Sequence, residues 1–194
     1  MSVCLLLIGD GRHDYRERTL RSAAVCLPPL DVCVEVDDTG HELGFAGAIA
    51  AGWDAVLATG ADHVFHLEAD FTFNDAVPLK QMIDALEADA ALAQVALKRQ
   101  PWNPDERAAG GICEQHPGDY ADEGPLSVHR RFFTTNPSVY STELCRLGWP
   151  QEPRSEGVFT HRLLAEGYRF AFWGAAADPP RVTHIGDERT GRGY

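Results

Sequence analysis

The chain contains, at residues 63–70, the stretch HVFHLEAD, in which a short apolar run ends in two acidic residues. The run has the length of a strand, and in an extended backbone residues two apart project from the same face. We therefore expect Glu68 and Asp70 to point into one pocket at the end of that strand. Two clustered carboxylates repel each other unless a cation lies beside them, and their oxygens suit Mg²⁺ or Mn²⁺. A solvated acidic turn without function is the alternative interpretation of these residues.

Two predicted strands nearer the N-terminus, a continuous apolar run over 3–8 and an alternating pattern over 32–36, also end in polar residues. These ends are Gly9-Asp10-Gly11-Arg12 after residues 3–8, and Asp37-Asp38-Thr39 after residues 32–36. In a parallel sheet covered by helices, the carboxyl ends of the strands share one edge, and ligands bind beyond that edge. The three polar ends therefore predict a single site, which is the strongest purely physical indication of function in the chain.

Strand and helix patterns alternate through the first half of the chain. The first helix is expected to be capped by Asp14 and to end near residue 25, and the second to run from residue 45 to Gly60. The later elements expected from pattern are a helix over 78–86, strands over 92–97 and 127–133, helices over 142–147 and 155–166, and a strand over 170–173. This order predicts an α/β fold, a single Rossmann-like domain over residues 1–194 with a mostly parallel central sheet flanked by helices.

The length and composition are those of an ordinary globular domain. The chain has 194 residues, of which 44% are hydrophobic and 24% charged, values that argue against wholesale disorder. No apolar run is long enough to cross a bilayer, and residues 3–8 are too few for a signal peptide. Five cysteines without CxxC spacing suit a reducing compartment. We therefore expect a cytoplasmic protein without stable membrane insertion.

The net charge of −12 argues against general nucleic-acid binding, because that requires clustered Lys and Arg to replace counterions. It does not exclude a nucleotide ligand, since a divalent cation can bring a diphosphate into an acidic pocket. Residues 100–125 are rich in Pro, Gly and charge. A loop of this length is usually functional or disordered, and the sequence leaves both possibilities open.

An ordered set of motifs resembles the family 2 inverting glycosyltransferases, which share the nucleotide-diphospho-sugar transferase fold called GT-A. Glu68-Ala69-Asp70 resembles the DxD motif of that family, with Glu in place of the first Asp. The other matching segments are residues 36–40 (the DDgS segment), 44–53 (the Gly- and Ala-rich helix), 155–163 with 167–169 (the ED…RL…G helix) and 182–184 (the late v.H strand). Each motif is weakly specific by itself, but together and in order they cover nearly the whole chain.

The resemblance implies transfer of a sugar from a nucleotide-diphosphate donor to an acceptor hydroxyl, with inversion. Asp70 and His184 would bind Mn²⁺ or Mg²⁺, which grips the diphosphate, and Glu156 would be the general base. The residues implied in donor binding are Asp10, Arg12, Asp38, Glu68 and Arg189. Residues 1–99 would form the nucleotide-sugar half, and residues 100–194 the acceptor half with a metal-binding tail.

Other interpretations stay open. The acidic pair of the family is Ser155-Glu156 here, and Glu156 would equally fit as an acid that favours the helix dipole. His184 would also fit as an ordinary strand histidine, and we interpret His63 and His66 as packing residues. A nucleotidyltransferase of similar fold and a non-catalytic binding protein are the alternative functions. The sequence does not identify the acceptor, whether protein, glycan, lipid carrier or modified base, or decide whether the chain forms a homo-oligomer.

Overall fold

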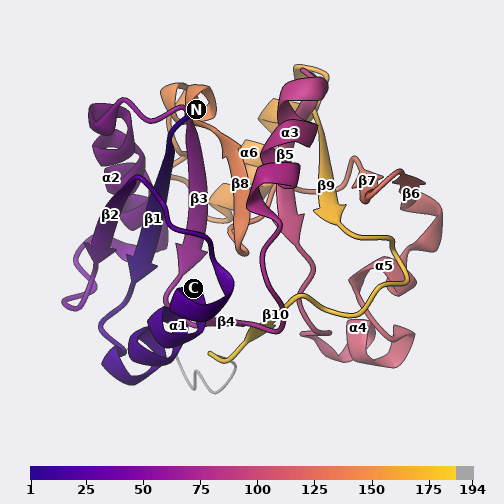
Figure 1. The fold of residues 1–194 in the computed structure, drawn as a ribbon, viewed down its shortest axis with the longest axis horizontal. Helices are drawn as coiled ribbons and strands as arrows, with labels where there is room; N and C mark the ends of the chain where they lie inside the picture. The colour runs from indigo at the N-terminus through magenta and orange to yellow at the C-terminus, as the bar shows by residue number, and fades with distance from the viewer. Residues whose placement is uncertain (187–194) are drawn as a thin grey trace.

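Eight strands form the central sheet of the computed structural model, which describes residues 1–186 (Figure 1). The strands are β1 (Val3–Gly9), β2 (Val32–Asp37), β3 (His63–Glu68), β5 (Leu92–Leu97), β6 (Tyr120–Glu123), β7 (Leu126–His129), β8 (Ser138–Ser141) and β9 (Arg169–Trp173). Their order is β2-β1-β3-β8-β5-β9-β7-β6. Only β7 and β8 pair antiparallel with both of their neighbours, so the other strands all point the same way. The predicted α/β fold with a mostly parallel sheet is confirmed.

Helices cover both faces of this sheet (Figure 1). The first face packs against α1 (His13–Cys26) and α3 (Leu79–Ala88). The second face packs against α2 (Gly44–Thr59), the 3-10 turn η2 (Thr142–Leu147) and α6 (Ser155–Ala165). The sheet is therefore the middle layer of three.

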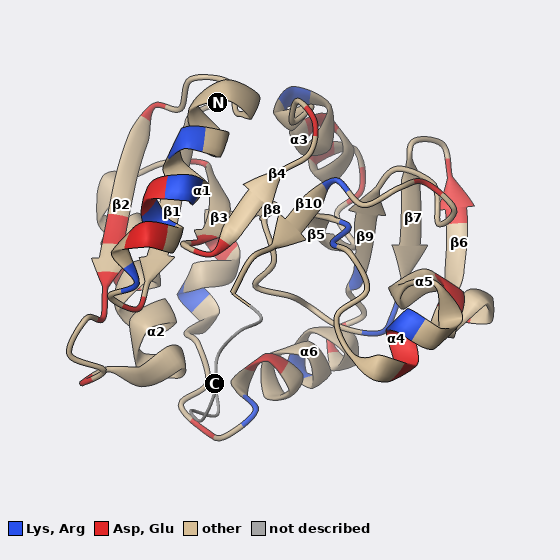
Figure 2. Cartoon of the chain, turned by 90° about the horizontal axis from the view of Figure 1, so that it is seen from below, with Lys and Arg blue, Asp and Glu red and all other residues tan. Residues whose placement is uncertain are grey.

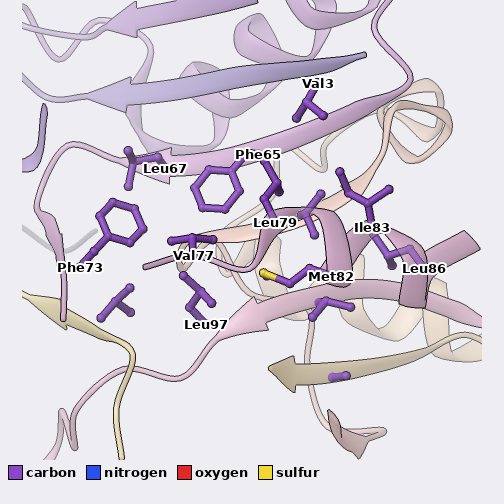
Figure 3. Packing of buried hydrophobic residues seen from close by; sticks show 14 of the residues in the cluster. Val3, Phe65, Leu67, Phe73, Val77, Leu79, Met82, Ile83, Leu86 and Leu97 are labelled. Atoms are coloured by element: carbon purple, nitrogen blue, oxygen red, sulfur yellow. The ribbon is translucent and has the colours of Figure 1, made fainter. Parts of the chain in front are cut away.

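Side chains of β3 alternate between two hydrophobic cores. Phe65 and Leu67 pack with Met82 of α3 in the first core (Figure 3). Val64 packs with Trp53 of α2 in the second core. Each of these five side chains is at most 1% exposed. Because β3 is held from both faces, the acidic residues at its carboxyl end, Glu68 and Asp70, start from a rigid position.

The histidines of β3 are buried, as their interpretation as packing residues predicts. His66 is 1% exposed, and its Nδ1 lies 3.0 Å from the hydroxyl of Tyr140. Burial lowers the pKa of His66 to about 3, so this ring is neutral. His63 is also buried, and burial lowers its pKa as well.

Several elements differ from the sequence-based expectations. β8 inserts antiparallel between β3 and β5, whereas the pattern indicated no strand there. The strand expected over 127–133 ends at His129, and residues 130–137 contain no helix or strand. Asp14 lies in the first turn of α1 and is not its cap; Arg12 occupies that position without a side-chain cap hydrogen bond.

Residues 100–125 are ordered, so the alternative of a disordered loop is wrong. They contain α4 (Pro104–Ala109), α5 (Ile112–Gln115), the 3-10 turn η1 (Pro117–Asp119) and β6. Asn103 caps α4 by accepting a hydrogen bond from the backbone N–H of Glu106 at 2.8 Å, and Gly110 ends the helix at φ 100°. Trp102, Glu106 and Ile112 of this region line the cavity at the carboxyl edge of the sheet.

Gly52 allows α2 to approach β1 closely. A Cβ at Gly52 would lie 2.8 Å from Cδ1 of Leu6, whereas a Cβ at Gly157 of α6 would meet nothing within 4 Å. Alanine at either position gains up to about 1 kcal/mol of helix propensity, and overpacking a core costs about 1–3 kcal/mol. We expect Gly52→Ala to be less stable than Gly157→Ala by about that overpacking cost in urea denaturation. Equal free energies of unfolding for the two variants would show that the Leu6 side chain moves to make room for the added methyl group.

Candidate functional site

A cavity of about 720 Å³ lies at the edge of the sheet where the parallel strands end. Figure 2 views the molecule from this edge, with α4, α5, α6 and the end of the described chain around it. Six of the residues predicted for the site line the cavity: Asp10, Arg12, Glu68, Asp70, Glu156 and His184. The structure therefore brings together residues from both halves of the chain.

The strand order explains why the cavity forms here. β2 lies on one side of β1 and β3 on the other, so the connections diverge at the carboxyl end of β1 and leave a crevice. Register pairs Ile8 with Glu68, and the N–H of Ala69 donates to the carbonyl of Ile8 at 2.8 Å. The ends of β1 and β3 are thus fixed side by side.

Gly11 lets the chain turn back over this crevice. Its φ is +84°, and a Cβ there would lie 2.8 Å from the Cα of Thr39. A side chain at Gly11 would be strained by the backbone conformation and would also clash with the segment after β2. This turn places the side chain of Arg12 beside Asp70.

Asp70 is the centre of a charged cluster and is 3% exposed. Nη2 of Arg12 donates to Oδ2 of Asp70 at 2.5 Å, and Nε2 of His184 lies 3.1 Å from the same oxygen. Nε of Arg12 also donates to both carboxylate oxygens of Asp10, at 3.0 and 2.9 Å. Burial by itself raises the pKa of Asp70, but the hydrogen bonds and charges of His184 and Arg12 outweigh it and lower the pKa. Asp70 is therefore ionised at neutral pH.

A small second sheet carries His184 to this cluster. β10 (Val182–His184) pairs antiparallel with β4 (Phe71–Phe73), and register places His184 opposite Phe71. The N–H of Ile185 then donates to the carbonyl of Asp70 at 2.8 Å. A Cβ at Gly186 would lie 2.2 Å from Oδ2 of Asp70. The chain thus passes so close to the carboxylate that only glycine fits at this position.

The pair formed by Asp70 and His184 suits a divalent cation shared with a phosphate ligand. A carboxylate oxygen and an imidazole nitrogen are both ligand types for Mn²⁺. Among residues 1–186, no group of three or more His, Cys, Asp or Glu side chains converges as a metal site. Mg²⁺ and Mn²⁺ need no such group, because phosphate oxygens and water usually complete their coordination. The residues present therefore fit a cation that arrives with, or is completed by, a diphosphate.

Glu156 lines the same cavity from the first turn of α6. Its Oε1 accepts hydrogen bonds from the backbone N–H of Thr135 at 2.9 Å and from the Thr135 hydroxyl at 3.0 Å. Burial raises the pKa of Glu156, and these hydrogen bonds together with the charge of Arg99 offset only part of that rise. A fixed carboxyl group with a raised pKa is typical of a general base.

Two predicted donor-binding residues are not among those that line the cavity. Asp38 is 5% exposed, and its carboxylate accepts hydrogen bonds from the N–H groups of Leu43 and Gly44, at 3.1 and 2.8 Å. It therefore holds the start of α2. Arg189 lies outside the described residues.

Sequence reasoning missed an ion pair beside the site. Nη1 and Nη2 of Arg99 donate to Oε2 and Oε1 of Glu106 at 2.7 and 3.0 Å, and Glu106 is 4% exposed. The sequence does contain a pattern that points to this region, because Asn103 and Glu106 have the spacing of a helix capping box. No local spacing pattern of this kind marks Thr135, which orients Glu156.

Comparison with known proteins supports the fold. No protein-family model and no curated protein sequence matches this chain. Among solved structures, the mannosyltransferase PcManGT of Pyrobaculum calidifontis, in complex with GDP-Man and Mn²⁺, matches 96% of the chain at 16% identity and a TM-score of 0.60. Residues 1–349 of S. aureus TarS match 95% of it at 12% identity and a TM-score of 0.61. The chain has a GT-A-like fold.

This GT-A-like chain spans 57% and 60% of the lengths of those two structures. At such low identity the likeness concerns the arrangement of strands and helices. No helix within residues 1–186 combines the length and apolar character needed to cross a membrane.

Proposed function

We propose that this protein is a family 2-like glycosyltransferase, which transfers a sugar from a nucleotide-diphosphate donor to an acceptor hydroxyl with inversion. The observation that carries the proposal is a cavity at the carboxyl edge of a GT-A-like sheet that Asp70, His184 and Glu156 all line, with Asp70 and His184 in contact. It is supported by the PcManGT structure, which contains GDP-Man and Mn²⁺. The first half of the chain would bind the donor, and residues 100–186 would supply the acceptor side.

Asp70 and His184 would hold Mn²⁺ or Mg²⁺ against the diphosphate of the donor. When bound, the cation neutralises negative charge on the leaving diphosphate. The guanidinium of Arg12 lies between Asp10 and Asp70. It would therefore place a second positive charge beside the diphosphate. Such a group donates charge-assisted hydrogen bonds to phosphate oxygens. These residues orient the donor so that the bond between its anomeric carbon and the phosphate oxygen can break.

Glu156 accepts the proton of the acceptor hydroxyl in this scheme. The hydroxyl oxygen forms a bond to the anomeric carbon from the side opposite the diphosphate, the bond to the diphosphate breaks, and the proton goes to the Glu156 carboxylate. Attack from the opposite side inverts the anomeric configuration. Thr135 keeps the carboxylate aimed into the cavity through its two hydrogen bonds.

The pH dependence of transfer tests the base assignment. Only the ionised carboxylate accepts a proton, so kcat/KM should fall as the pH decreases through the raised pKa of Glu156. The inflection should lie above 4.5, the ordinary value for Glu, and kcat/KM reports the free enzyme. The residual activity of Glu156→Gln should not show this fall of kcat/KM at low pH. An inflection below 4.5, or the same fall in Glu156→Gln, would contradict the assignment.

Product analysis separates this proposal from the alternative functions. Purified protein is incubated with Mn²⁺ and, in separate reactions, a panel of nucleotide sugars that begins with GDP-mannose or a panel of nucleoside triphosphates each with a sugar phosphate. A glycosyltransferase releases the nucleoside diphosphate, by transfer or by slow hydrolysis of the donor. A nucleotidyltransferase releases pyrophosphate from a nucleoside triphosphate and a sugar phosphate. Neither product would favour a non-catalytic binding protein.

A further inference from the structure

The segment after β5 lies along the segment that leads to His184. The carbonyl of Lys98 accepts hydrogen bonds from the N–H groups of Arg181 and Val182, at 2.7 and 3.2 Å, and Nζ of Lys98 donates to the carbonyl of Ala176 at 2.6 Å. Arg99 forms an isolated parallel bridge with Val182. Figure 1 shows this return segment in yellow, running from β9 past α5 to β10. The path to the proposed cation site is thus attached to the end of β5 residue by residue.

Gln100 continues this attachment onto His184 itself. Its Nε2 donates to the carbonyl of His184 at 2.8 Å, and its Oε1 accepts from the N–H of His184 at 2.9 Å. A primary amide is suited to this role because it donates and accepts at the same time. The side chain of Gln100 therefore does for His184 what a neighbouring strand would do.

Trp102 holds the ring of the same histidine. The ring centroids of Trp102 and His184 are 4.1 Å apart in an edge contact, and Phe71 lies 4.6 Å from the imidazole. Trp102 is itself fixed, because its backbone N–H donates at 2.7 Å to Oε2 of the buried Glu106, which is paired with Arg99. Backbone and ring of His184 are therefore both held by one segment, residues 98–106, and Nε2 is directed at Asp70.

We propose that Gln100 and Trp102 are positioning residues for the cation site. They fix the backbone and the ring of His184, so that its Nε2 and Oδ2 of Asp70 meet before a cation binds. The inference rests on the proposed function, because it assumes that His184 is a cation ligand. Loss of an outer partner of a metal ligand typically weakens metal binding by about 10–100-fold.

The test measures Mn²⁺ affinity from the electron paramagnetic resonance signal of free Mn²⁺, in the presence of GDP. Gln100→Met keeps the length of the side chain and removes both hydrogen bonds, and Trp102→Leu removes the aromatic contact. We expect each to weaken Mn²⁺ binding by about 10–100-fold. Trp102→Phe, which keeps an aromatic ring, should restore most of the affinity. Gln81→Ala, an exposed change on α3, should leave it unchanged.

Nuclear magnetic resonance of the metal-free protein provides a second readout. The ¹⁵N and ¹H shifts of the His184 ring should change in Gln100→Met and Trp102→Leu, and should be unaltered in Gln81→Ala. A merely structural role would lower the free energy of unfolding in urea without changing this ring. Unchanged ring shifts together with unchanged Mn²⁺ affinity in both variants would overturn the inference.

His184→Ala distinguishes failure of this inference from failure of the proposed function. If His184→Ala weakens Mn²⁺ binding but Gln100→Met and Trp102→Leu do not, only the positioning role is wrong. If His184→Ala leaves Mn²⁺ binding unchanged, the cation assignment is wrong and the inference falls with it.

Discussion

Replacing Asp70 with asparagine is expected to abolish the Mn²⁺-dependent binding of nucleotides and to lower sugar transfer by at least about 10²–10³-fold, the usual loss when a group that stabilises transition-state charge is removed. Asp70 is the carboxylate on which Arg12 and His184 converge, and it is 3% exposed. Asparagine keeps an oxygen for Arg12 but loses the negative charge that a cation requires. Asp70→Asn therefore tests the effect of the charge alone. Asp70→Ala would also leave the Arg12 guanidinium without this acceptor.

Thermal melting measures this effect on the donor side alone and requires no acceptor. The protein is melted against a panel of nucleoside diphosphates and nucleotide sugars, each with and without Mn²⁺. A ligand that binds only the folded state stabilises it by about 2.7 kcal/mol at one hundred times its dissociation constant. Wild type should respond to one nucleotide only when Mn²⁺ is present, and Asp70→Asn should not respond.

Asp84→Asn is the matched control. Asp84 is exposed on α3 and pairs only with Lys80 among the contacts of its carboxylate in the described chain. The Asp84→Asn variant should bind nucleotide as wild type does. A metal-dependent shift that survives in Asp70→Asn would place the cation elsewhere. No shift for any nucleotide with wild-type protein would favour a non-catalytic protein.

Glu156→Gln should reduce sugar transfer by about 10²–10⁴-fold, the usual contribution of a general base, while donor binding is retained. The amide oxygen of glutamine can still accept the two hydrogen bonds from Thr135, so the side chain keeps its place. It has no carboxylate to take the proton of the acceptor hydroxyl. The measurement is kcat from release of the nucleoside diphosphate, together with the melting shift described above.

Glu152→Gln is the control for this change, since Glu152 is an exposed acid shortly before α6. It should be fully active. A fully active Glu156→Gln enzyme would refute the base assignment, and loss of the nucleotide-dependent melting shift would show that Glu156 acts on the donor. Asp70→Asn and Glu156→Gln together therefore separate the donor side of the cavity from the acceptor side.

The long periodic segments of the fold were predictable, and the short ones were not. Continuous apolar runs identify β1 and β3, and helical spacing identifies α2, because each carries enough residues to show a period. β8 and β4 have four and three residues, too few for a pattern. They form because neighbouring strands supply their hydrogen bonds. The order of residues 104–123 has a similar origin, since α4 is held by the ion pair between Arg99 and Glu106.

Sequence by itself determined the edge at which the site lies, because parallel strands separated by helices present their carboxyl ends together. It also supplied the carboxylates and the histidine. Only the tertiary structure decided what each one contacts. Asp38 follows a strand as Asp10 and Asp70 do, yet its carboxylate accepts hydrogen bonds from the N–H groups at the start of α2. His184 reaches Asp70 because β10 pairs with β4 and Gln100 holds it there. Those contacts join segments far apart in the chain, so no local pattern of residues encodes them.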